Sequence, residues 1–600
     1  MAAPLPPATF LVVRFSFAKG SRPVMLLPSE IRPGPFLAVT EFGLTVTAVL
    51  AAFTRPQLGA EYFERMERGF ERLSRRKGLI VYVGLSVIVL RVALLPLFPV
   101  PLPFVTDDFS FLFACDTFAH GRLANPTPAM WPHFETILIT MRPTYQSMYF
   151  PGQGLLLAAG QVLVGQPWFA LLAMDGLMCA ALTWALQGWL PRRWALLGGI
   201  IAVLRLGLFS VWINTYQGAA LLAAFGGALV LGGLPRLMKT GRFLYALLMG
   251  VGISILVLTR PYEGLLLCLA VAFALGRWIV KGKNKPPLGT LVRRAVFPLI
   301  VIFGSVAWLG YYDYKAFGNP LTLPYTIDRQ TYSPTPYYVW QKLRPEPIYP
   351  DQAMRAFYED DSQIYRALHS WRGFLPWTAA KVIFNLLFYT GFLFLPALFM
   401  FRRAFLDRRM RFLAICTLIL VGGFAIEVYL VPYYLAAFVV VLYAFGLQMM
   451  RHLRVWKSGA NPVGLALVRF TIAACVLMAG VRVLAEPLHL GPPEFPEGSW
   501  NLFWYGPQHF GTERMAIGAW LERQPGRQLV IVRYWGNHHP VDEWVYNSAD
   551  IDSAKVIWAR DVGLLGNREL IRYYGDYKVW LVEPDAMPAR ITPYPMPEPK

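Results

Sequence analysis

Residues 105–154 have the sequence VTDDFSFLFACDTFAHGRLANPTPAMWPHFETILITMRPTYQSMYFPGQG, a polar and aromatic-rich stretch between long apolar segments. It opens with two adjacent carboxylates, Asp107 and Asp108, and closes with a turn-rich run from Tyr149 to Gly154. In a chain that crosses a membrane, polar groups at a membrane face are the first place to expect chemistry. We therefore expect the rest of the chain to be organised around this stretch.

The composition predicts a membrane protein. Hydrophobic residues make up 56% of the chain and charged residues only 15%, against roughly 25% charged residues in a typical globular domain. Apolar runs of about 17 or more residues recur along the chain, and such runs are long enough to form membrane helices. The net charge of +20 comes from basic residues in short loops between these runs. This placement follows the positive-inside rule, and it favours a membrane partner over nucleic acid.

The apolar runs give an α-helical polytopic membrane protein with about 11–13 transmembrane helices. The runs predicted to be membrane helices are 37–53, 78–97, 167–189, 194–212, 217–234, 243–259, 262–280, 295–312, 376–401, 411–428, 430–449 and 465–485. The shorter run 154–165 is predicted to be a re-entrant or surface-lying helix.

The distribution of Lys and Arg predicts the topology. Basic segments such as 54–77, 235–242, 281–294 and 402–411 alternate with turns that are poor in basic residues. We therefore expect the basic loops in the cytoplasm, and residues 105–154, 313–375 and 486–600 outside an inner (cytoplasmic) membrane. Within segment 60–77, apolar residues recur at helical spacing between Arg and Glu, which predicts an amphipathic helix on the cytoplasmic leaflet.

These features divide the chain into five parts. They are residues 1–36, without an assigned structure; 37–97, the first membrane helices with the amphipathic helix; 98–166, an external catalytic loop; 167–485, the transmembrane core with external loop 313–375; and 486–600, a small external α/β domain. In the last part, helical patterns at 512–524 and 563–574 alternate with β-rich runs at 528–533, 555–559 and 578–583. Its acids and imidazoles between 537 and 552 are most simply a polar surface loop, with ligand or metal binding as the alternative.

The acidic pair is the main catalytic candidate. Thr106 or Asp107 could simply cap a helix over 109–120, with carboxylates in its first turn. Capping is compatible with catalysis, because a carboxylate is the usual general base for an acceptor hydroxyl. In a second interpretation, Asp108 holds a divalent cation that neutralises a phosphate leaving group.

Further polar residues are candidates for substrate binding. His133 and Glu135 lie in the same loop, but their spacing does not match the helical metal-binding motif. Arg260 and Glu263 lie in a short outward turn, where Arg260 either reaches lipid headgroups or binds a phosphate. Asp175 and Arg205 are predicted to lie at similar depth in neighbouring membrane helices, which favours a structural ion pair that Arg91 could join.

The acidic pair in a first large external loop resembles the GT-C-type membrane glycosyltransferases, in particular protein O-mannosyltransferases and the aminoarabinose transferases of lipid A. The resemblance is carried by residues 106–110, 133–135 and 147–154 and covers roughly 78–400. It implies transfer of a sugar, with inversion, from a polyprenyl-phosphate-linked donor to a lipid, polysaccharide or protein acceptor. It also implies that Asp107 or Asp108 is the catalytic base and that Tyr149 and Gln153 help to bind substrate.

Two other classes of function stay open at this point. A lipid or polysaccharide transporter or flippase would be favoured by inverted repeats and helices broken near the middle of the membrane. A non-catalytic envelope assembly protein would use the outer domain for docking. An enclosed arrangement of the outer loops around Asp107 and Asp108 would favour the enzyme.

Overall fold

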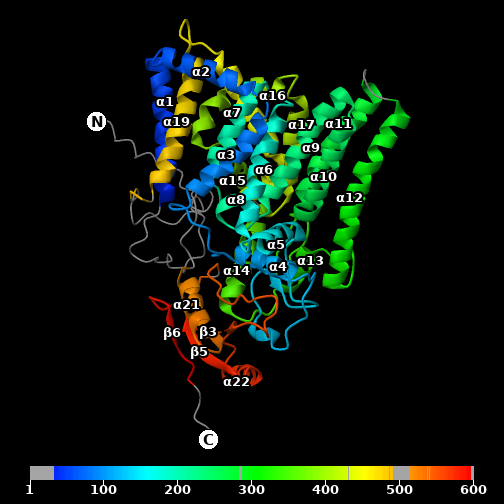
Figure 1. The fold of residues 1–600 in the computed structure, drawn as a ribbon, viewed down its shortest axis with the longest axis vertical. Helices are drawn as coiled ribbons and strands as arrows, with labels where there is room; N and C mark the ends of the chain where they lie inside the picture. The colour runs from blue at the N-terminus through cyan, green and yellow to red at the C-terminus, as the bar shows by residue number, and fades with distance from the viewer. Residues whose placement is uncertain are drawn as a thin grey trace.

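The computed structural model describes residues 33–282, 287–429, 431–485, 487–488, 490, 512–536, 538–539 and 541–595. Figure 1 shows a bundle of long helices with a small α/β domain at one end. The chain is therefore a multi-pass α-helical membrane protein with a C-terminal α/β domain, as the sequence predicts. Residues 1–32 of the unassigned N-terminal part lie outside the described residues.

Every predicted membrane run contains helix. The helices of the bundle are α1 (Pro33–Thr54), α3 (Leu79–Ala93), α6 (Trp168–Leu186), α7 (Arg192–Ala202), α9 (Ala220–Thr240), α10 (Phe243–Thr259), α11 (Pro261–Lys281), α12 (Leu288–Phe317), α15 (Trp371–Thr390), α17 (Arg411–Ile426), α18 (Val439–Arg454) and α19 (Val463–Ala485). Among the described residues, 7 helices are long and apolar enough to span a membrane, or up to 8 if a bent pair is one span. This count is below the expected one because α3, α10 and α17 are shorter apolar helices of 10–17 residues.

Two of the predicted runs are broken, and here the expectation of a single straight helix is wrong. In run 194–212, α7 passes into a π-helical turn, η2 (Val203–Gly207), and then into α8 (Val211–Asn214). In run 376–401, α15 ends at Gly391, and η3 (Phe392–Met400) with α16 (Phe401–Leu406) continues at an angle of 109°. Gly391 has φ 70°, a left-handed conformation that glycine adopts without a steric penalty.

The predicted external loops, 98–166 and 313–375, fold into a layer between the bundle and the C-terminal domain (Figure 1). Its elements are α4 (Thr106–Ala119), η1 (Trp131–His133), β1 (Ile139–Thr140), β2 (Gln146–Ser147), α5 (Pro151–Val164), α13 (Pro324–Tyr332) and α14 (Gln352–Leu368). The predicted re-entrant or surface segment is α5, which packs against both α4 and α6. The first external loop is therefore supported by the bundle on one side and by the C-terminal domain on the other.

The C-terminal domain contains a four-stranded sheet in the order β4-β3-β5-β6. Its elements are α21 (Thr512–Arg523), β3 (Arg527–Val532), β4 (Val556–Arg560), α22 (Leu564–Tyr573), β5 (Tyr577–Glu583) and β6 (Arg590–Pro593). The first three strands are parallel, and β3 is buried along nearly its whole length, as expected for a parallel strand covered on both faces. The sequence predicts all of these elements except β6, a short antiparallel edge strand that ends in proline.

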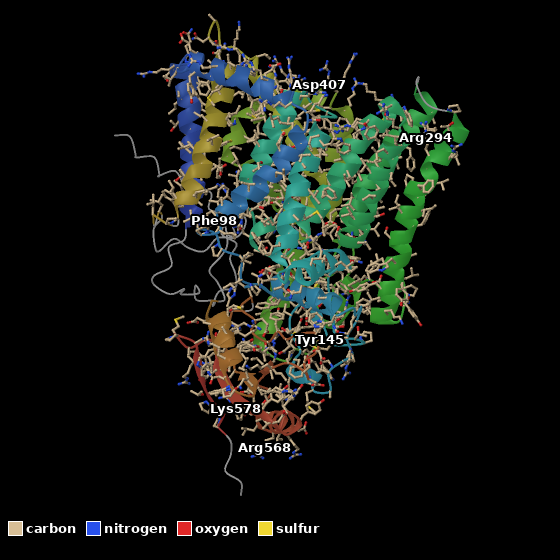
Figure 2. All side chains as sticks on the ribbon, viewed as in Figure 1. Phe98, Tyr145, Arg294, Asp407, Arg568 and Lys578 are labelled. Atoms are coloured by element: carbon tan, nitrogen blue, oxygen red, sulfur yellow. The ribbon has the colours of Figure 1, made fainter. Side chains whose placement is uncertain are left out.

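The basic loops gather at the end of the bundle opposite the C-terminal domain. Figure 2 shows Arg294 and Asp407 at that end and Arg568 and Lys578 at the other. The amphipathic helix α2 (Ala60–Ser74, labelled in Figure 1) lies at the same end as Arg294 (labelled in Figure 2). This separation agrees with the predicted alternation of the loops. Lys283 and Lys285, which belong to one of these loops, lie outside the described residues.

The predicted pairing of Asp175 with Arg205 is wrong. Arg205 instead makes an ion pair of 3.0 Å with Glu41 of α1 and donates to the backbone carbonyl of Phe388 at 2.7 Å. Arg205 lies within the π-helical turn η2, whose extra residue changes the direction of the side chains that follow α7.

Asp175 has other neighbours. Its Oδ1 accepts a hydrogen bond from the Cys179 thiol at 3.8 Å, and Arg91 is the cation that acts on its charge. Arg91 in turn donates to the carbonyl of Phe98 at 2.6 Å and to Asn214 at 3.1 Å. Of the three charged residues grouped from the sequence, Asp175 and Arg91 interact electrostatically, and Arg205 belongs to a separate group with Glu41.

Candidate functional site

The two adjacent carboxylates of α4 lie in different surroundings, because neighbouring residues point about 100° apart around a helix. Asp108 is fully buried, and its two oxygens accept the backbone N–H groups of Tyr216 (2.9 Å) and Phe104 (3.3 Å). Asp107 is half-buried, and its Oδ1 accepts a hydrogen bond of 2.5 Å from the Tyr149 hydroxyl. Asp108 therefore holds two backbone segments together, whereas Asp107 is the carboxylate that remains partly accessible.

Both carboxylates titrate above their ordinary range. Burial raises the pKa of Asp108 to about 7, although its backbone hydrogen bonds act in the opposite direction. Burial also raises the pKa of Asp107, while the Tyr149 hydrogen bond and the positive charge of Arg260 lower it. A carboxylate whose pKa is raised in this way is a stronger base than a solvated one.

The turn at 214–218 connects Asp108 with Arg260. Gln153 donates from Nε2 to the carbonyl of Tyr216 at 3.0 Å, so Gln153 and Asp108 hold the same residue of the turn. Two residues later, the carbonyl of Gly218 accepts hydrogen bonds from Arg260 Nε (3.1 Å) and Nη2 (2.6 Å). Asp108 and Gln153 therefore support the backbone on which Arg260 rests.

Arg260 is buried at the start of α11 among aromatic rings. Its guanidinium carbon lies 4.8 Å from the ring centre of Tyr433 and 4.7 Å from that of Tyr434. Its Nη1 lies 3.9 Å from Glu263 Oε1, beyond hydrogen-bonding distance. Among the described residues no hydrogen bond uses Nη1, so this nitrogen is available to an anionic ligand.

Sequence reasoning missed Tyr325 and Tyr433. Tyr325 of α13 packs edge-on against the rings of Tyr149 (5.8 Å) and Phe150 (5.1 Å), and it interacts electrostatically with Arg260. Tyr433 interacts with both Asp107 and Arg260. A tyrosine in a turn or in a 60-residue loop gives no signal of its own, and only the fold shows that both tyrosines interact with Asp107 and Arg260.

Two buried charges near Glu263 were also missed. Glu427 follows α17 and interacts electrostatically with Glu263, Lys381 and Arg260. Lys381 of α15 donates from Nζ to the carbonyl of Glu427 at 2.5 Å. Both residues lie within or at the end of apolar runs, and an ionisable group in such a run is itself a signal of function.

His133 and Glu135 are not among the residues around Asp107 and Arg260. His133 is buried beside Gly566 of α22. The Glu135 side chain interacts with Tyr332 and with Arg560 of β4, and burial raises the pKa of this carboxyl. Both candidates therefore lie where the first external loop meets α13 and the C-terminal domain, and their predicted role in substrate binding stays a prediction.

The donor set at Asp108 does not fit a divalent cation. Both of its oxygens already accept backbone N–H groups, whereas Mg²⁺ or Ca²⁺ needs oxygen atoms free to coordinate it. No group of three or more His, Cys, Asp or Glu residues that could hold a metal occurs in the described part of the chain. This applies equally to the His538 region, where His538 pairs with Asp585 at 2.8 Å and Glu543 pairs with Arg560 at 2.7 Å.

No family model matches this sequence, and no curated protein is similar to it. Among solved structures, it is similar to an oligosaccharyltransferase of Archaeoglobus fulgidus tethered with an acceptor peptide, with 11% identity, a TM-score of 0.45 and coverage of 84% of this chain and 69% of that chain. It is also similar to the archaeal oligosaccharyltransferase AglB from the same organism in complex with an inhibitory peptide and a dolichol-phosphate, with 12% identity, a TM-score of 0.44 and coverage of 84% and 69%. A third similar structure is ArnT from Cupriavidus metallidurans in the apo state, with 14% identity, a TM-score of 0.45 and coverage of 84% and 92%.

Proposed function

We propose that this protein is a GT-C-type glycosyltransferase. It takes a sugar from a polyprenyl-phosphate-linked donor and transfers it, with inversion, to an acceptor hydroxyl on a lipid, polysaccharide or protein. The site lies at the outer face of the inner membrane, and the C-terminal domain is periplasmic. The observation that carries the proposal is the grouping of a half-buried carboxylate, Asp107, with a buried arginine, Arg260, at the end of the membrane helices.

In the proposed reaction, Asp107 removes the proton of the acceptor hydroxyl as its oxygen attacks the anomeric carbon. The bond between that carbon and the phosphate oxygen breaks, and the phosphate leaves with the bonding electron pair. The proton ends on the Asp107 carboxyl, and the negative charge ends on the carrier phosphate. Attack from the side opposite the leaving group inverts the anomeric centre.

Arg260 is suited to the departing phosphate. Its Nε and Nη2 are held by the Gly218 carbonyl, while Nη1 has no such partner. A charge-assisted hydrogen bond to a developing anion typically contributes a few kcal/mol, or about a hundredfold in rate. Tyr149 keeps the Asp107 carboxylate in one orientation through its 2.5 Å hydrogen bond.

The donor's lipid chain has a place beside the site. Arg260 and Glu263 lie at the first turn of α11, and the same helix carries the exposed apolar side chains Leu265, Leu269 and Phe273. A lipid carrier lying along this surface would keep its chain in the bilayer and present its phosphate at the level of Arg260. Glu427 interacts electrostatically with Arg260, Glu263 and Lys381, and we propose that Lys381 and Glu427 tune the charge around Arg260.

The test is to incubate the purified protein with a panel of polyprenyl-phosphate sugars and candidate acceptors, and to measure the carrier phosphate that is released. Release should occur with at least one donor, and Asp107→Asn should abolish it while the variant still binds that donor. The matched control is Asp576→Asn, which makes the same change at an exposed carboxylate of the C-terminal domain that lies 3.7 Å from Arg527. Release at the parent rate by Asp107→Asn would contradict the proposal.

A further inference from the structure

The C-terminal domain covers the back of the helix that carries Asp107. The Phe109 ring of α4 is stacked on Tyr546, with 4.4 Å between ring centres and an angle of 9° between the planes. The guanidinium carbon of Arg514, from α21, also lies 4.5 Å from the centre of the Phe109 ring. Phe109 therefore packs against two residues of the C-terminal domain.

The segment 544–549 is fixed to α4 and its loop along its length. Arg514 donates to the carbonyls of Trp544 and Tyr546, both at 3.0 Å, and the Tyr546 hydroxyl donates to the carbonyl of Ile137 at 3.1 Å. Asp116, two turns along α4 from Phe109, accepts the backbone N–H of Ala549 at 2.7 Å. Contacts at both ends of α4 leave this helix little freedom to rotate or slide.

A buried arginine reinforces the same junction. Arg560, at the end of β4, donates to the Glu135 carbonyl at 3.0 Å and pairs with Glu543 Oε2 at 2.7 Å. It also pairs with Asp351, the N-cap of α14. One side chain therefore joins the C-terminal domain to the first external loop and to the loop 313–375.

The helix geometry relates these contacts to the carboxylate. Residues two apart in an α-helix point about 200° away from each other. The side of α4 that presents Phe109 to the C-terminal domain is thus opposite the side on which Asp107 meets Tyr149 and Arg260. Rotation of α4 about its axis would move the Asp107 oxygens away from these partners, and a displacement of about 1 Å in an active site can cost about a hundredfold in rate.

We infer that the C-terminal domain is a positioning element for the catalytic carboxylate, and that Tyr546 is its principal positioning residue. Tyr546 acts through Phe109 and sets the rotation of α4, and thereby the direction of Asp107. This inference rests on the proposed function for its catalytic consequence, although the contact between Tyr546 and α4 is independent of it.

The kinetic test compares Tyr546→Ala, Tyr546→Phe and Tyr573→Ala in the full-length protein. Tyr573 is an exposed tyrosine on α22 of the same domain. Tyr573→Ala removes the same side-chain volume as Tyr546→Ala and therefore serves as the control. Tyr546→Ala should lower kcat between about 10-fold and 100-fold and leave the donor KM within about twofold, because donor binding depends on Arg260. Tyr546→Phe keeps the stacked ring and should keep kcat within about threefold of the parent, as should Tyr573→Ala.

A structural readout separates this inference from the proposed function. Hydrogen–deuterium exchange of residues 106–119, measured without substrate, should rise in Tyr546→Ala and stay at the parent level in the other two variants. If Asp107→Asn transfers at the parent rate, the proposed function fails and the exchange result still tests the contact. If Tyr546→Ala does not fold, Tyr546→Leu keeps most of the apolar volume without the stacked ring and takes its place. A parent-like kcat in folded Tyr546→Ala, or in Tyr546→Leu where it takes its place, would overturn the inference. An equal loss of kcat in Tyr573→Ala would overturn it as well.

Discussion

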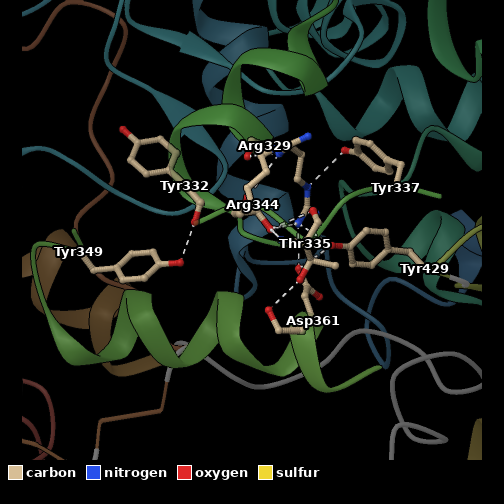
Figure 3. Close-up of polar contacts among 10 residues, drawn as sticks. Arg329, Tyr332, Thr335, Tyr337, Arg344, Tyr349, Asp361 and Tyr429 are labelled. Atoms are coloured by element: carbon tan, nitrogen blue, oxygen red, sulfur yellow. Dashed lines mark hydrogen bonds and ion pairs between the residues drawn. The ribbon is translucent and has the colours of Figure 1, made fainter. Parts of the chain in front are cut away.

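Two buried clusters are built from the same residue types, and they differ in whether their arginine is paired with a carboxylate. Arg329 Nη1 donates hydrogen bonds to Asp361 (2.8 Å), Tyr429 (2.8 Å) and Ser333 (3.1 Å). Figure 3 shows this cluster. Around Arg260, the nearest carboxylate oxygen is 3.9 Å away. Both guanidinium groups are buried among tyrosine rings, so composition alone does not distinguish them.

The difference shows which cluster is structural and which is available to a ligand. A buried cation that is paired with a carboxylate at hydrogen-bonding distance stabilises one conformation, whereas a buried cation whose nearest carboxylate lies beyond that distance is suited to an incoming anion. The two clusters are also connected, because α13 carries Tyr325 beside Arg260 and, one turn later, Arg329. The cluster around Arg329 therefore holds α13, and with it Tyr325, against the candidate site.

The largest expected effect is the loss of transfer rate at Asp107, which contrasts with the loss of stability expected at Asp361. Asp107→Asn removes the proposed base and should lower the transfer rate about 10²–10⁴-fold, while the variant melts like the parent. Asp361→Asn should retain most of the turnover per folded molecule but lose stability, because Asp361 is the counter-charge of Arg329. Transfer assays combined with thermal melting of both purified variants check this contrast, and equal activity losses at both positions would remove the distinction.

A smaller effect is expected at the arginines themselves. Arg260→Gln should lower the rate about a hundredfold and weaken donor binding, since it removes the proposed contact to the phosphate. Arg329→Gln should instead destabilise the fold by up to about 3 kcal/mol, because it leaves the half-buried Asp361 without its counter-charge. Donor titrations and denaturation curves are the measurements. If Arg329→Gln weakened donor binding and melted normally, the Arg329 cluster would be part of the binding site.

The smallest effect concerns a carboxylate beside Arg329. Asp328 is fully buried, and burial raises its pKa to about 6, against about 3.9 in an unfolded chain. Between these values the folded state holds more protons, so the free energy of unfolding falls as the pH rises from about 4 to about 6, by at most about 3 kcal/mol. Melting temperatures between pH 4 and pH 8 should show this decline in the parent and a smaller one in Asp328→Asn. An unchanged decline in the variant would assign the titration to another group.

Much of the fold was predictable because apolar length alone identifies a membrane helix. The interruptions were not predictable, since neither the π-helical turn at Val203–Gly207 nor the bend at Gly391 changes the hydropathy of its run. This explains the error over Arg205, because its predicted direction assumed a regular helix. In the C-terminal domain, alternating helical and β-rich patterns gave the correct elements, and only the short strand β6 lacked a pattern of its own.

The candidate site was predictable in part. Charge patterning placed the loop that contains Asp107 and the short turn that contains Arg260 at the same end of the bundle. Tyr149 lies in the same loop as Asp107, and its role was implied by the family resemblance. His133 and Glu135 share a loop with Asp107, but sequence proximity does not tell which side of a folded loop faces the membrane. Only the structure distinguishes Asp107 from Asp108 as the candidate base, because the rotation of α4 decides which of the two carboxylates is buried.

The bend at Gly391 has a consequence for how this sequence can evolve. A Cβ atom at this position would lie against the Glu41 carboxylate and 2.6 Å from Arg205 Nη1. Any replacement of the glycine would therefore disturb an ion pair between residues that lie 164 positions apart in the chain. A change at position 391 therefore acts on positions 41 and 205 as well, and among related proteins we expect these three positions to vary together.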